Sequence, residues 1–342
     1  MKNNQLMIYG AYGYAGELMV REAVAQRLRP IIAGRDAEKL KPIATELSLE
    51  CRAFGVRNTG SNLQDISVLL NCAGPFSATA EPLARACLAQ QIHYLDITGE
   101  IDIFRKCHAL DEEARQQNVL ILPGAGTDIV PTDCLAAMLK EKLPVATRID
   151  LALSFGTNPS IGTVNTMIES FGKGGLIREG GMLKVVSNAF QMRKIPFQNK
   201  PQWAMTIPWG DVFTSGISTG VPDGAVYMAM PRMSIYMIRL TNPVKGILNT
   251  QFGQKITKRL AGWLMKKGPD AKALEAGRGQ FWGEAEAPDG EKLEMTMSTP
   301  NVYALTATVG IRIAQYCLDY TGPGGYYTPS MLLGSRFIES IP

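Results

Sequence analysis

The stretch Leu6-Met-Ile-Tyr9-Gly10-Ala-Tyr12-Gly13-Tyr14-Ala-Gly16 decides how the chain begins to fold. Its first four residues are apolar and predict a buried strand, and the helix-like segment Glu17–Gln26 follows directly. Glycines at this spacing permit a tight turn, a close approach of the backbone to a diphosphate, and close packing of the helix on the strand. A helix start of this kind binds phosphate through its backbone amides. The stretch predicts a dinucleotide-binding loop, although a plain glycine turn is the alternative, and we expect these residues at the cofactor: Gly10, Tyr12, Gly13, Tyr14 and Gly16.

Apolar runs and helix-like segments alternate through the first part of the chain. This alternation is typical of βαβ units around a parallel sheet. Right-handed crossovers place the carboxyl ends of all the strands at one edge, where ligands bind. The runs are Pro30–Ala33, Val68–Cys72, Tyr94–Ile97 and Val119–Leu122, and the helices between them are Ala37–Leu47, Ala80–Ala89 and Ile103–Gln117.

The pattern changes after Pro144, where strand-like segments follow one another with few helices between them. We predict an antiparallel sheet here, with strands at Ile149–Phe155, Ala225–Met230 and Ser234–Leu240. The sequence therefore divides into a Rossmann domain, residues 1–145, and a domain for substrate binding and dimerisation, residues 146–299. The apolar helix Tyr303–Leu318 lies within a final segment, residues 300–342, that we expect to complete the first domain.

Composition indicates an ordinary globular protein. The chain has 342 residues, of which 46% are hydrophobic and 19% charged, and its net charge is +4. That charge is spread along the chain, so nucleic acid is not an expected partner. The six cysteines include no CxxC pair, which argues against disulfide scaffolds and zinc sites. With no signal peptide and no apolar run of about 18 residues, we expect a cytoplasmic protein without a metal or a membrane span.

A second signal lies at the end of the second predicted strand, in Ala33-Gly34-Arg35-Asp36. An NAD enzyme usually has an acidic residue about 20 residues after the glycine loop, where it binds the ribose 2′-hydroxyl. Arg35 stands near that point, and a planar guanidinium binds a 2′-phosphate through paired hydrogen bonds. The sequence therefore predicts NADP as the cofactor. The alternative is that Arg35 is a surface residue and Asp36 binds the ribose.

The third apolar run closes with Asn71-Cys72-Ala73-Gly74-Pro75-Phe76. We expect the backbone of Gly74 and Pro75 to face the nicotinamide ribose. A nucleophilic thiol needs a nearby base and an exposed, electropositive setting, and the sequence indicates neither for Cys72. We therefore interpret Cys72 as a buried residue beside the cofactor, and the remaining expected contacts are Ala73 and Phe76.

Two clusters with carboxylates follow the later strands, Asp96-Ile-Thr98-Gly99-Glu100 and Pro123-Gly-Ala-Gly126-Thr-Asp128. We expect Thr98 and Gly99 beside the nicotinamide. The catalytic candidates are Asp128, as the source of a proton, and Glu100, which competes for that role. Water is a further alternative. No Tyr-x-x-x-Lys pair, the proton donor of classical short-chain dehydrogenases, occurs anywhere in the sequence.

Capping is the competing explanation for several of these polar residues. Thr132 and Asp133 follow Pro131 and can cap a helix Cys134–Leu143. Thr98 and Glu100 can likewise cap the helix that we predict from Ile103.

Taken together, the motifs resemble the saccharopine dehydrogenase-like family, and in particular its trans-acting enoyl reductase branch. In the first half the resemblance rests on GAYGYAG at 10–16, AGR at 33–35, NCAGPF at 71–76, HYLDITGE at 93–100 and PGAGTDIVPTD at 123–133. In the second half it rests on Gly162-Thr163-Val164, Trp209-Gly-Asp211, Ser218-Thr-Gly220-Val-Pro222, Gly268-Pro269 and Trp282-Gly-Glu284-Ala285.

The resemblance implies an α/β fold, with a doubly wound parallel Rossmann sheet and a second, mixed α/β domain that carries substrate and dimer contacts. It implies NADP-dependent hydride transfer to an imine or to an enoyl or carbonyl substrate, and a homodimer. Saccharopine enzymes bind two substrate carboxylates through basic side chains, for which this chain offers Arg178, Arg193 and Arg232.

Three features keep alternatives open. Gly162-Thr163 precedes a helix-like segment, Asn165–Ser170, whose start could bind an anion. The segment Lys255–Lys267 has an apolar stripe among basic residues, so contact with a membrane surface or an acidic carrier protein is an alternative to ordinary packing. Because the sequence does not establish which residue would donate a proton, the chain could also be a protein that senses NADP(H) without turnover.

Overall fold

The computed structural model describes residues 4–155, 174–198, 200–240, 242–244 and 277–341. The chain forms two compact units, one from residues 1–130 and 303–342 and one from residues 131–302. The division therefore falls within the first turn of helix α6 (Val130–Lys142) and again at the start of helix α13 (Val302–Leu318).

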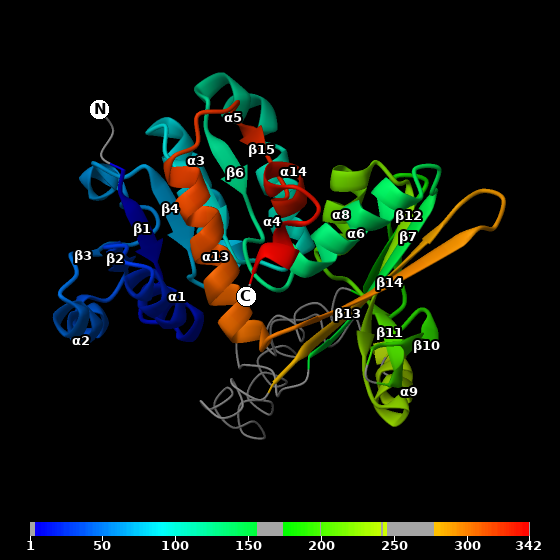
Figure 1. Cartoon of the computed structure of the whole chain (residues 1–342). Helices are drawn as coiled ribbons and strands as arrows, with labels where there is room; N and C mark the ends of the chain where they lie inside the picture. The colour runs from blue at the N-terminus through cyan, green and yellow to red at the C-terminus, as the bar shows by residue number, and fades with distance from the viewer. Residues whose placement is uncertain (1–3, 156–173, 199, 241, 245–276, 342) are drawn as a thin grey trace. The chain divides into compact units, whose positions relative to one another are not determined.

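The first unit is built on a parallel sheet of seven described strands in the order β15-β6-β5-β4-β1-β2-β3. Its central strands are short and fully buried, because Val, Ile and Leu fill both of their faces. The order runs outward in both directions from β1 and β4, which is the doubly wound arrangement that the sequence predicts (Figure 1). The strands are β1 Leu6–Tyr9, β2 Ile31–Gly34, β3 Cys51–Ala53, β4 Val68–Asn71, β5 His93–Asp96, β6 Leu120–Leu122 and β15 Gly325–Tyr326.

Helices connect these strands, and their positions follow the prediction with one correction. The charged segment expected as one helix, Ile103–Gln117, is two helices, α4 (Ile101–His108) and α5 (Asp111–Gln117). The buried Leu110 makes the turn between them, and the acidic start of α5 complements the dipole of a new helix. The other helices are α1 Tyr14–Ala25, α2 Ala37–Leu47 and α3 Phe76–Ala89.

Helix α13 belongs to the first unit although it follows the second unit in sequence. In Figure 1 it is the orange helix that runs across the first unit's sheet. A Cβ atom on Gly310 would lie 2.5 Å from the Cε of Met19 in α1, so the two helices pack closely at this glycine. At its start, Tyr303 makes an edge-to-face contact with Tyr14, with ring centroids 5.3 Å apart. The helix therefore packs beside the glycine loop.

The second unit is built on a sheet with the path β10-β11-β12-β7-β13-β14, and β8 pairs with β12 and β9. The expected all-antiparallel sheet is wrong, because β12 runs parallel to β7. The connection between these two strands contains four described strands and helix α8 (Asp211–Thr219), so β12 can start from the same end of the sheet as β7. The strands are β7 Arg148–Phe155, β8 Gly175–Glu179, β9 Met182–Val186, β10 Met192–Pro196, β11 Pro201–Ile207, β12 Asp223–Ala229, β13 Gly279–Glu286 and β14 Lys292–Thr299.

Two further predictions in this unit are wrong. The expected strand Ser234–Leu240 is part of a helix, α9 (Arg232–Leu240), in which Ile235 alone is fully buried. The apolar run had resembled a strand, but Pro231 starts a helix instead. Asp133 does not precede helix α6 as a cap, because that helix already begins at Val130, three residues earlier.

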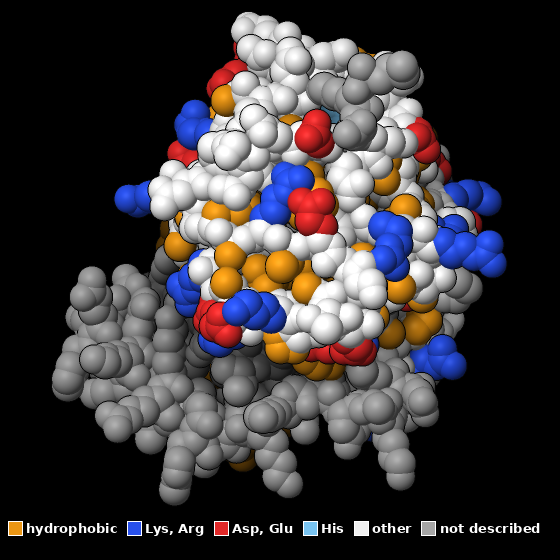
Figure 2. Space-filling view, turned by 90° about the vertical axis from the view of Figure 1, so that its left-hand side faces the viewer, with side chains coloured by type: hydrophobic (Ala, Val, Ile, Leu, Met, Phe, Trp, Pro, Cys, Tyr) orange, Lys and Arg blue, Asp and Glu red, His pale blue; other side chains and the backbone are white. Residues whose placement is uncertain are grey.

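One face of the molecule carries charges of both signs. Figure 2 shows Lys and Arg side chains interleaved with Asp and Glu side chains, and hydrophobic atoms gather between them. No field of a single sign therefore arises from this face. Within the described ranges, no helix is both long and apolar enough to cross a membrane, and no group of three or more His, Cys, Asp or Glu side chains could hold a metal ion.

Candidate functional site

The loop between β1 and α1 has the shape of a phosphate cradle. Gly10 has φ +86°, and a Cβ atom there would lie 2.7 Å from the backbone nitrogen of Ala73. A Cβ atom on Gly16 would lie 2.2 Å from the carbonyl oxygen of Gly10, so any side chain there would force the backbone to shift. Gly13 is the N-cap of α1, and no described side chain caps this helix start. The loop thus fits a cofactor diphosphate, with glycine required at two positions by the backbone alone.

The end of β2 supports the loop from one side. The carbonyl oxygen of Ala33 accepts hydrogen bonds from the amides of Gly10 and Ala11, at 2.7 and 3.1 Å. A Cβ atom on Gly34 would lie 2.6 Å from the ring of Tyr12, so this glycine lets the ring approach the strand end closely. Arg35 is exposed directly after it. An exposed guanidinium beside the loop fits the 2′-phosphate of NADP.

Asp36, the alternative partner for a ribose, already has a local role. Its Oδ1 accepts hydrogen bonds from the amides of Glu38 and Lys39, at 3.1 and 3.3 Å, and so caps helix α2. Its Oδ2 lies 3.6 Å from Nζ of Lys39. A carboxylate engaged in this way is a poorer ribose ligand, which favours Arg35 as the residue that selects the cofactor.

The loop after β4 contains the predicted residues Cys72 to Phe76. Gly74 and Pro75 are exposed, and Phe76 begins α3. Cys72 is buried, and its Sγ lies 3.3 Å from the sulfur of Met19. Burial raises the pKa of the Cys72 thiol far above its usual range, and the nearby Asp96 carboxylate adds to the rise. The thiol therefore stays protonated, which agrees with the reading that it is no nucleophile.

The loop after β5 holds the predicted residues Thr98, Gly99 and Glu100. Thr98 is fully buried, and its Oγ1 accepts a hydrogen bond from the amide of Glu100 at 3.1 Å. Glu100 is the N-cap of α4 without a side-chain capping bond. This bond lies in the loop before α4, which begins at Ile101, two residues before the predicted start, and no described side chain caps the helix there. Glu100 stays partly accessible.

Asp128 follows the glycine turn after β6. It is partly accessible, and burial by surrounding protein atoms raises the pKa of its carboxyl to about 7. Its loop is held against the neighbouring strand end, because the amide of Ala125 donates to the carbonyl oxygen of Asp96 at 2.6 Å. Thr306 of α13 also binds this loop, with its Oγ1 3.2 Å from the amide nitrogen of Thr127. A carboxyl with a pKa near 7 can exist in both forms at neutral pH, as proton transfer requires.

These loops meet at one edge of the parallel sheet, because each of them follows the carboxyl end of a strand. The structure also brings in buried polar residues that the sequence analysis did not select. Asn71, Tyr94 and Asp96 are fully buried at the ends of β4 and β5, where they contact one another. Polar residues at alternate positions of an apolar strand, as in Tyr94-Leu95-Asp96, were the available signal.

The three arginines of the second unit have separate partners. Arg178 is buried and donates to the backbone oxygens of Val212 and Val221 and to Oγ of Ser215. Burial lowers the pKa of its guanidinium to about 10. Arg232 lies over the ring of Trp203, 5.0 Å from the centroid. The hydrogen bonds of Arg178 to Val212 and Ser215 join β8 to α8. Arg178 and Arg232 therefore contact different neighbours.

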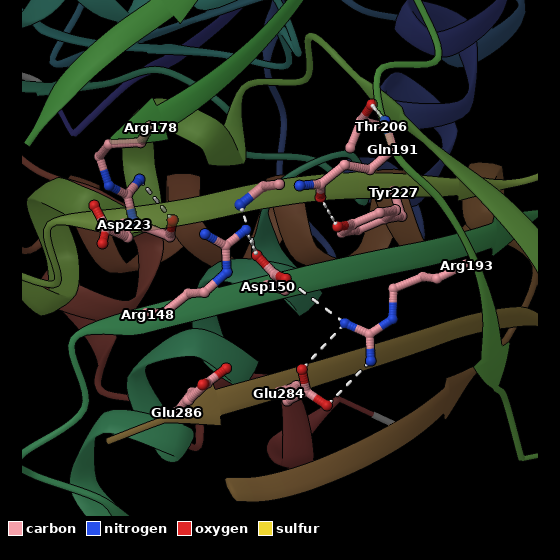
Figure 3. Close-up of polar contacts among 12 residues, drawn as sticks. Arg148, Asp150, Arg178, Gln191, Arg193, Thr206, Asp223, Tyr227, Glu284 and Glu286 are labelled. Carbon is pink, nitrogen blue, oxygen red and sulfur yellow. Dashed lines mark hydrogen bonds and ion pairs between the residues drawn. The ribbon is translucent and has the colours of Figure 1, made fainter. Parts of the chain in front are cut away.

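Arg193 belongs to a network of charges across the second unit's sheet. Figure 3 shows its guanidinium between Asp150 and Glu284, from strands β7 and β13. It binds both oxygens of Glu284 at 3.1 Å and lies 3.6 Å from Asp150, while Arg148 lies 2.9 Å from Asp150. The Arg193 guanidinium also lies 4.7 Å from the Trp282 ring centroid. The guanidinium of Arg193 is therefore already paired with carboxylates of the chain itself.

Two expectations lie outside the described residues. They are the possible anion site at Gly162-Thr163 with its helix Asn165–Ser170, and the basic segment Lys255–Lys267.

Comparison with known proteins finds a family model that matches part of the first unit. Residues 6–122 match the model of the saccharopine dehydrogenase NADP binding domain. The saccharopine dehydrogenase-like oxidoreductase of Rattus norvegicus is 26% identical over 231 residues, which are 59% of this chain and 53% of the rat protein. A protein of Mycobacterium tuberculosis, provisionally named a trans-acting enoyl reductase, is 28% identical over 206 residues, 54% of this chain and 44% of its own length. The chain thus spans about half the length of the curated relatives it matches.

The fold of the whole chain is also known from solved structures. Apo saccharopine dehydrogenase (L-Glu forming) from Saccharomyces cerevisiae matches with a TM-score of 0.64 at 10% identity, over 95% of this chain and 94% of the yeast chain. At that identity the likeness establishes the fold. It confirms a Rossmann unit joined to a second unit of mixed strands and helices.

Proposed function

We propose that this chain, whose residues 6–122 belong to the saccharopine dehydrogenase NADP-binding domain family, is an enzyme that transfers a hydride between NADPH and an imine, enoyl or carbonyl carbon. The observation that carries the proposal is the convergence of the glycine loop, the exposed Arg35 and the titratable Asp128 at one edge of a parallel sheet. Bound NADPH supplies the hydride, and the chain's residues bind it and manage the proton.

Cofactor binding is assigned to the loops at this edge. The amides at the start of α1 receive the diphosphate, and Arg35 receives the 2′-phosphate. The backbone from Cys72 to Phe76 and the pair Thr98 and Gly99 lie beside the nicotinamide in this proposal. Tight backbone contact between Gly10 and Ala73 supports it, because it brings the loop after β4 next to the diphosphate loop.

Asp128 is the proposed proton source. Its pKa of about 7 lets a large share of the protein carry the proton at neutral pH, which an ordinary aspartate near 3.9 cannot do. Glu100, on the neighbouring loop, is the competing group. Aspartate or glutamate in these positions protonates the atom next to the one that receives the hydride.

A substrate with two carboxylates, resembling saccharopine, is not favoured by the arginines described in the second unit. Binding two carboxylates needs two available basic side chains, but Arg193 binds Glu284 and Arg178 is buried among carbonyl oxygens, which leaves Arg232 of the three predicted arginines. The compartment and the homodimer expected from the sequence stay predictions.

The proposal is tested by single-turnover hydride transfer from NADPH with a panel of imines and enoyl thioesters. Asp128→Asn should reduce the rate by about 100-fold with unchanged NADPH affinity, since a missing general acid costs that much. The parent rate should fall as pH rises through about 7, because the donated proton is then lost, and Asp128→Asn should lack this fall. Glu100→Gln is the matched variant. If it alone abolishes transfer, Glu100 is the acid, and full rates in both variants would leave water as the donor.

A further inference from the structure

A chain of hydrogen bonds runs through the interior beneath the carboxyl edge of the first unit's sheet. Oδ2 of Asp96 accepts from the Tyr94 hydroxyl at 2.9 Å, and that hydroxyl also receives a bond from Nδ2 of Asn71 at 3.2 Å. The same Asn71 Nδ2 lies 3.2 Å from Oγ1 of Thr79 in α3. Asn71 and Asp96 are register partners on adjacent strands, so the parallel pairing of β4 and β5 aligns these groups.

The ends of this chain bind the backbone of three loops. Oδ1 of Asp96 accepts hydrogen bonds from the amides of Thr98 at 3.0 Å and Gly124 at 3.1 Å. Oδ1 of Asn71 accepts from the amide of Ala73 at 3.0 Å. One set of side chains therefore joins the loops that follow β4, β5 and β6.

The Asp96 carboxylate is held there at an energetic cost. Its side chain has 0% exposure, and three hydrogen bonds lower the pKa of the carboxyl, yet burial still raises that pKa to about 6. The desolvation penalty is thus larger than the gain from the bonds. An asparagine would fit the same space without a buried charge. Buried charged groups that lower the stability of the folded state cluster at functional sites.

Among the residues that the structure describes, the titratable groups around Asp96 do not offset that charge. The thiols of Cys72 and Cys107 and the phenol of Tyr94 face Asp96, and burial raises the pKa of all three groups. They remain neutral near pH 7, so the amides of Thr98 and Gly124 and the Tyr94 hydroxyl carry the stabilisation of the anion.

We propose that Asp96 is a positioning residue, which acts with Tyr94 and Asn71 to lock the three loops in the geometry that binds NADPH. The inference rests on the proposed place of these loops beside the cofactor. Charged acceptors make hydrogen bonds about twice as strong as neutral ones, so the anion is the better lock for the two amides. The Ala73 loop in turn supports Gly10, through the backbone contact at that glycine.

The test compares three variants of the full chain by calorimetric NADPH titration, hydrogen exchange and urea unfolding. Asp96→Asn keeps one acceptor oxygen for both amides but loses the charge and the acceptor for Tyr94. Tyr94→Phe breaks the chain in its middle and leaves Asp96 in place. Both should bind NADPH about tenfold more weakly, equivalent to about 1.4 kcal/mol. Exchange should quicken in peptides that cover residues 72–76, 97–100 and 123–126.

Tyr320→Phe is the matched control. The Tyr320 hydroxyl donates to a backbone oxygen, that of Pro323 at 3.1 Å, and the ring lies against His93 at the opposite, amino end of β5. This variant should leave NADPH affinity unchanged. Asp96→Asn should in addition be more stable than the parent protein in urea at pH 8, a gain of stability with a loss of affinity that a purely structural residue would not show.

The inference is overturned if folded Asp96→Asn and Tyr94→Phe bind NADPH as tightly as the parent, or if Tyr320→Phe loses affinity equally. If Asp96→Asn does not fold, Tyr94→Phe decides by the same titration. A parent protein that does not bind NADPH would instead overturn the proposed function, so the two failures are separate.

Discussion

At the scale of single residues, we predict that Arg35 decides which nicotinamide cofactor the chain prefers. It is exposed at the end of β2, and Asp36 beside it is engaged as a helix cap. Arg35→Ala should weaken NADPH binding by about 1.5–3 kcal/mol, the worth of a hydrogen bond to a charged group, and should leave NADH binding nearly unchanged. Isothermal titration with both cofactors measures the difference.

Lys41→Ala is the control for this prediction, because Lys41 is an exposed cation on α2, the helix that follows Arg35, and pairs with Glu38 at 2.6 Å. If both variants lose the same NADPH affinity, Arg35 acts through general electrostatic attraction and not through a specific contact with the 2′-phosphate. Parent protein with equal affinity for NADPH and NADH would remove Arg35 from cofactor selection altogether.

The sequence was informative about residues whose role depends on backbone position. The positions of the glycines and of Arg35 could be predicted because a strand, a turn and a helix fix where they lie, while their contacts with the cofactor stay predictions. The Asp96 network could not be assigned, because it depends on the pairing of β4 with β5 and on α3, which are distant in sequence. The partners of Arg193 could likewise not be predicted. Glu284 lies 91 residues away in the sequence, and only the folding of the second unit's sheet brings it close to Arg193.

At the scale of elements, the turn into α1 separates cofactor binding from folding. A Cβ atom on Gly13 meets the oxygen of Gly10 at 3.2 Å, which small shifts can relieve, whereas one on Gly16 meets it at 2.2 Å. Gly13→Val should therefore stay folded by circular dichroism and lose NADPH binding. Gly16→Ala should lower the free energy of unfolding by about 1–3 kcal/mol, as overpacking does.

Urea unfolding and NADPH titration of both variants check this prediction. Undiminished affinity in folded Gly13→Val would show that the loop is a structural turn. A Gly16→Ala protein with parent stability would show that α1 can move away from β1, against the close packing of this glycine on Gly10.

In the first unit the type of each predicted element agrees with the local sequence pattern. In part of the second unit the prediction from that pattern is wrong. Buried parallel strands are continuous apolar runs, so β1, β2, β4, β5 and β6 could be predicted. The strand β3 was missed, because its three residues are not fully buried and form no apolar run. The segment Ser234–Leu240 has the same apolar character, but four of the large side chains in α9, Met233, Tyr236, Met237 and Leu240, are exposed. In a segment this short, the spacing of apolar residues alone does not distinguish a helix from a strand.

At the scale of the whole molecule, buried acids should make stability depend on pH. Folded Asp96 and Asp128 have pKa values of about 6 and about 7, against about 3.9 for an unfolded aspartate. Between pH 4 and 7 the folded state therefore holds protons that the unfolded state has released. The contribution of each group to stability is present below the unfolded pKa and is lost as pH rises through the folded pKa.

Urea unfolding of the parent, Asp96→Asn and Asp128→Asn at pH 5 and pH 8 tests this linkage. Relative to the parent, each variant should be more stable at pH 8 than at pH 5, because it lacks the group whose ionisation is unfavourable in the folded state. A difference of the opposite sign would mean that the carboxylate is stabilised by partners rather than destabilised by burial. The double variant should show both effects if the sites do not interact.

The central claim, that this chain is an NADPH-dependent reductase, is tested most directly by hydride transfer itself. NADPH carrying deuterium at the transferable position is mixed with the chain and a panel of imines and enoyl thioesters, and absorbance and product mass are followed in one turnover. The account predicts that one substrate class oxidises NADPH and gains one deuterium at carbon, and that Gly13→Val abolishes the transfer. Tight NADPH binding without deuterium in any product would contradict it and would favour a protein that senses the cofactor.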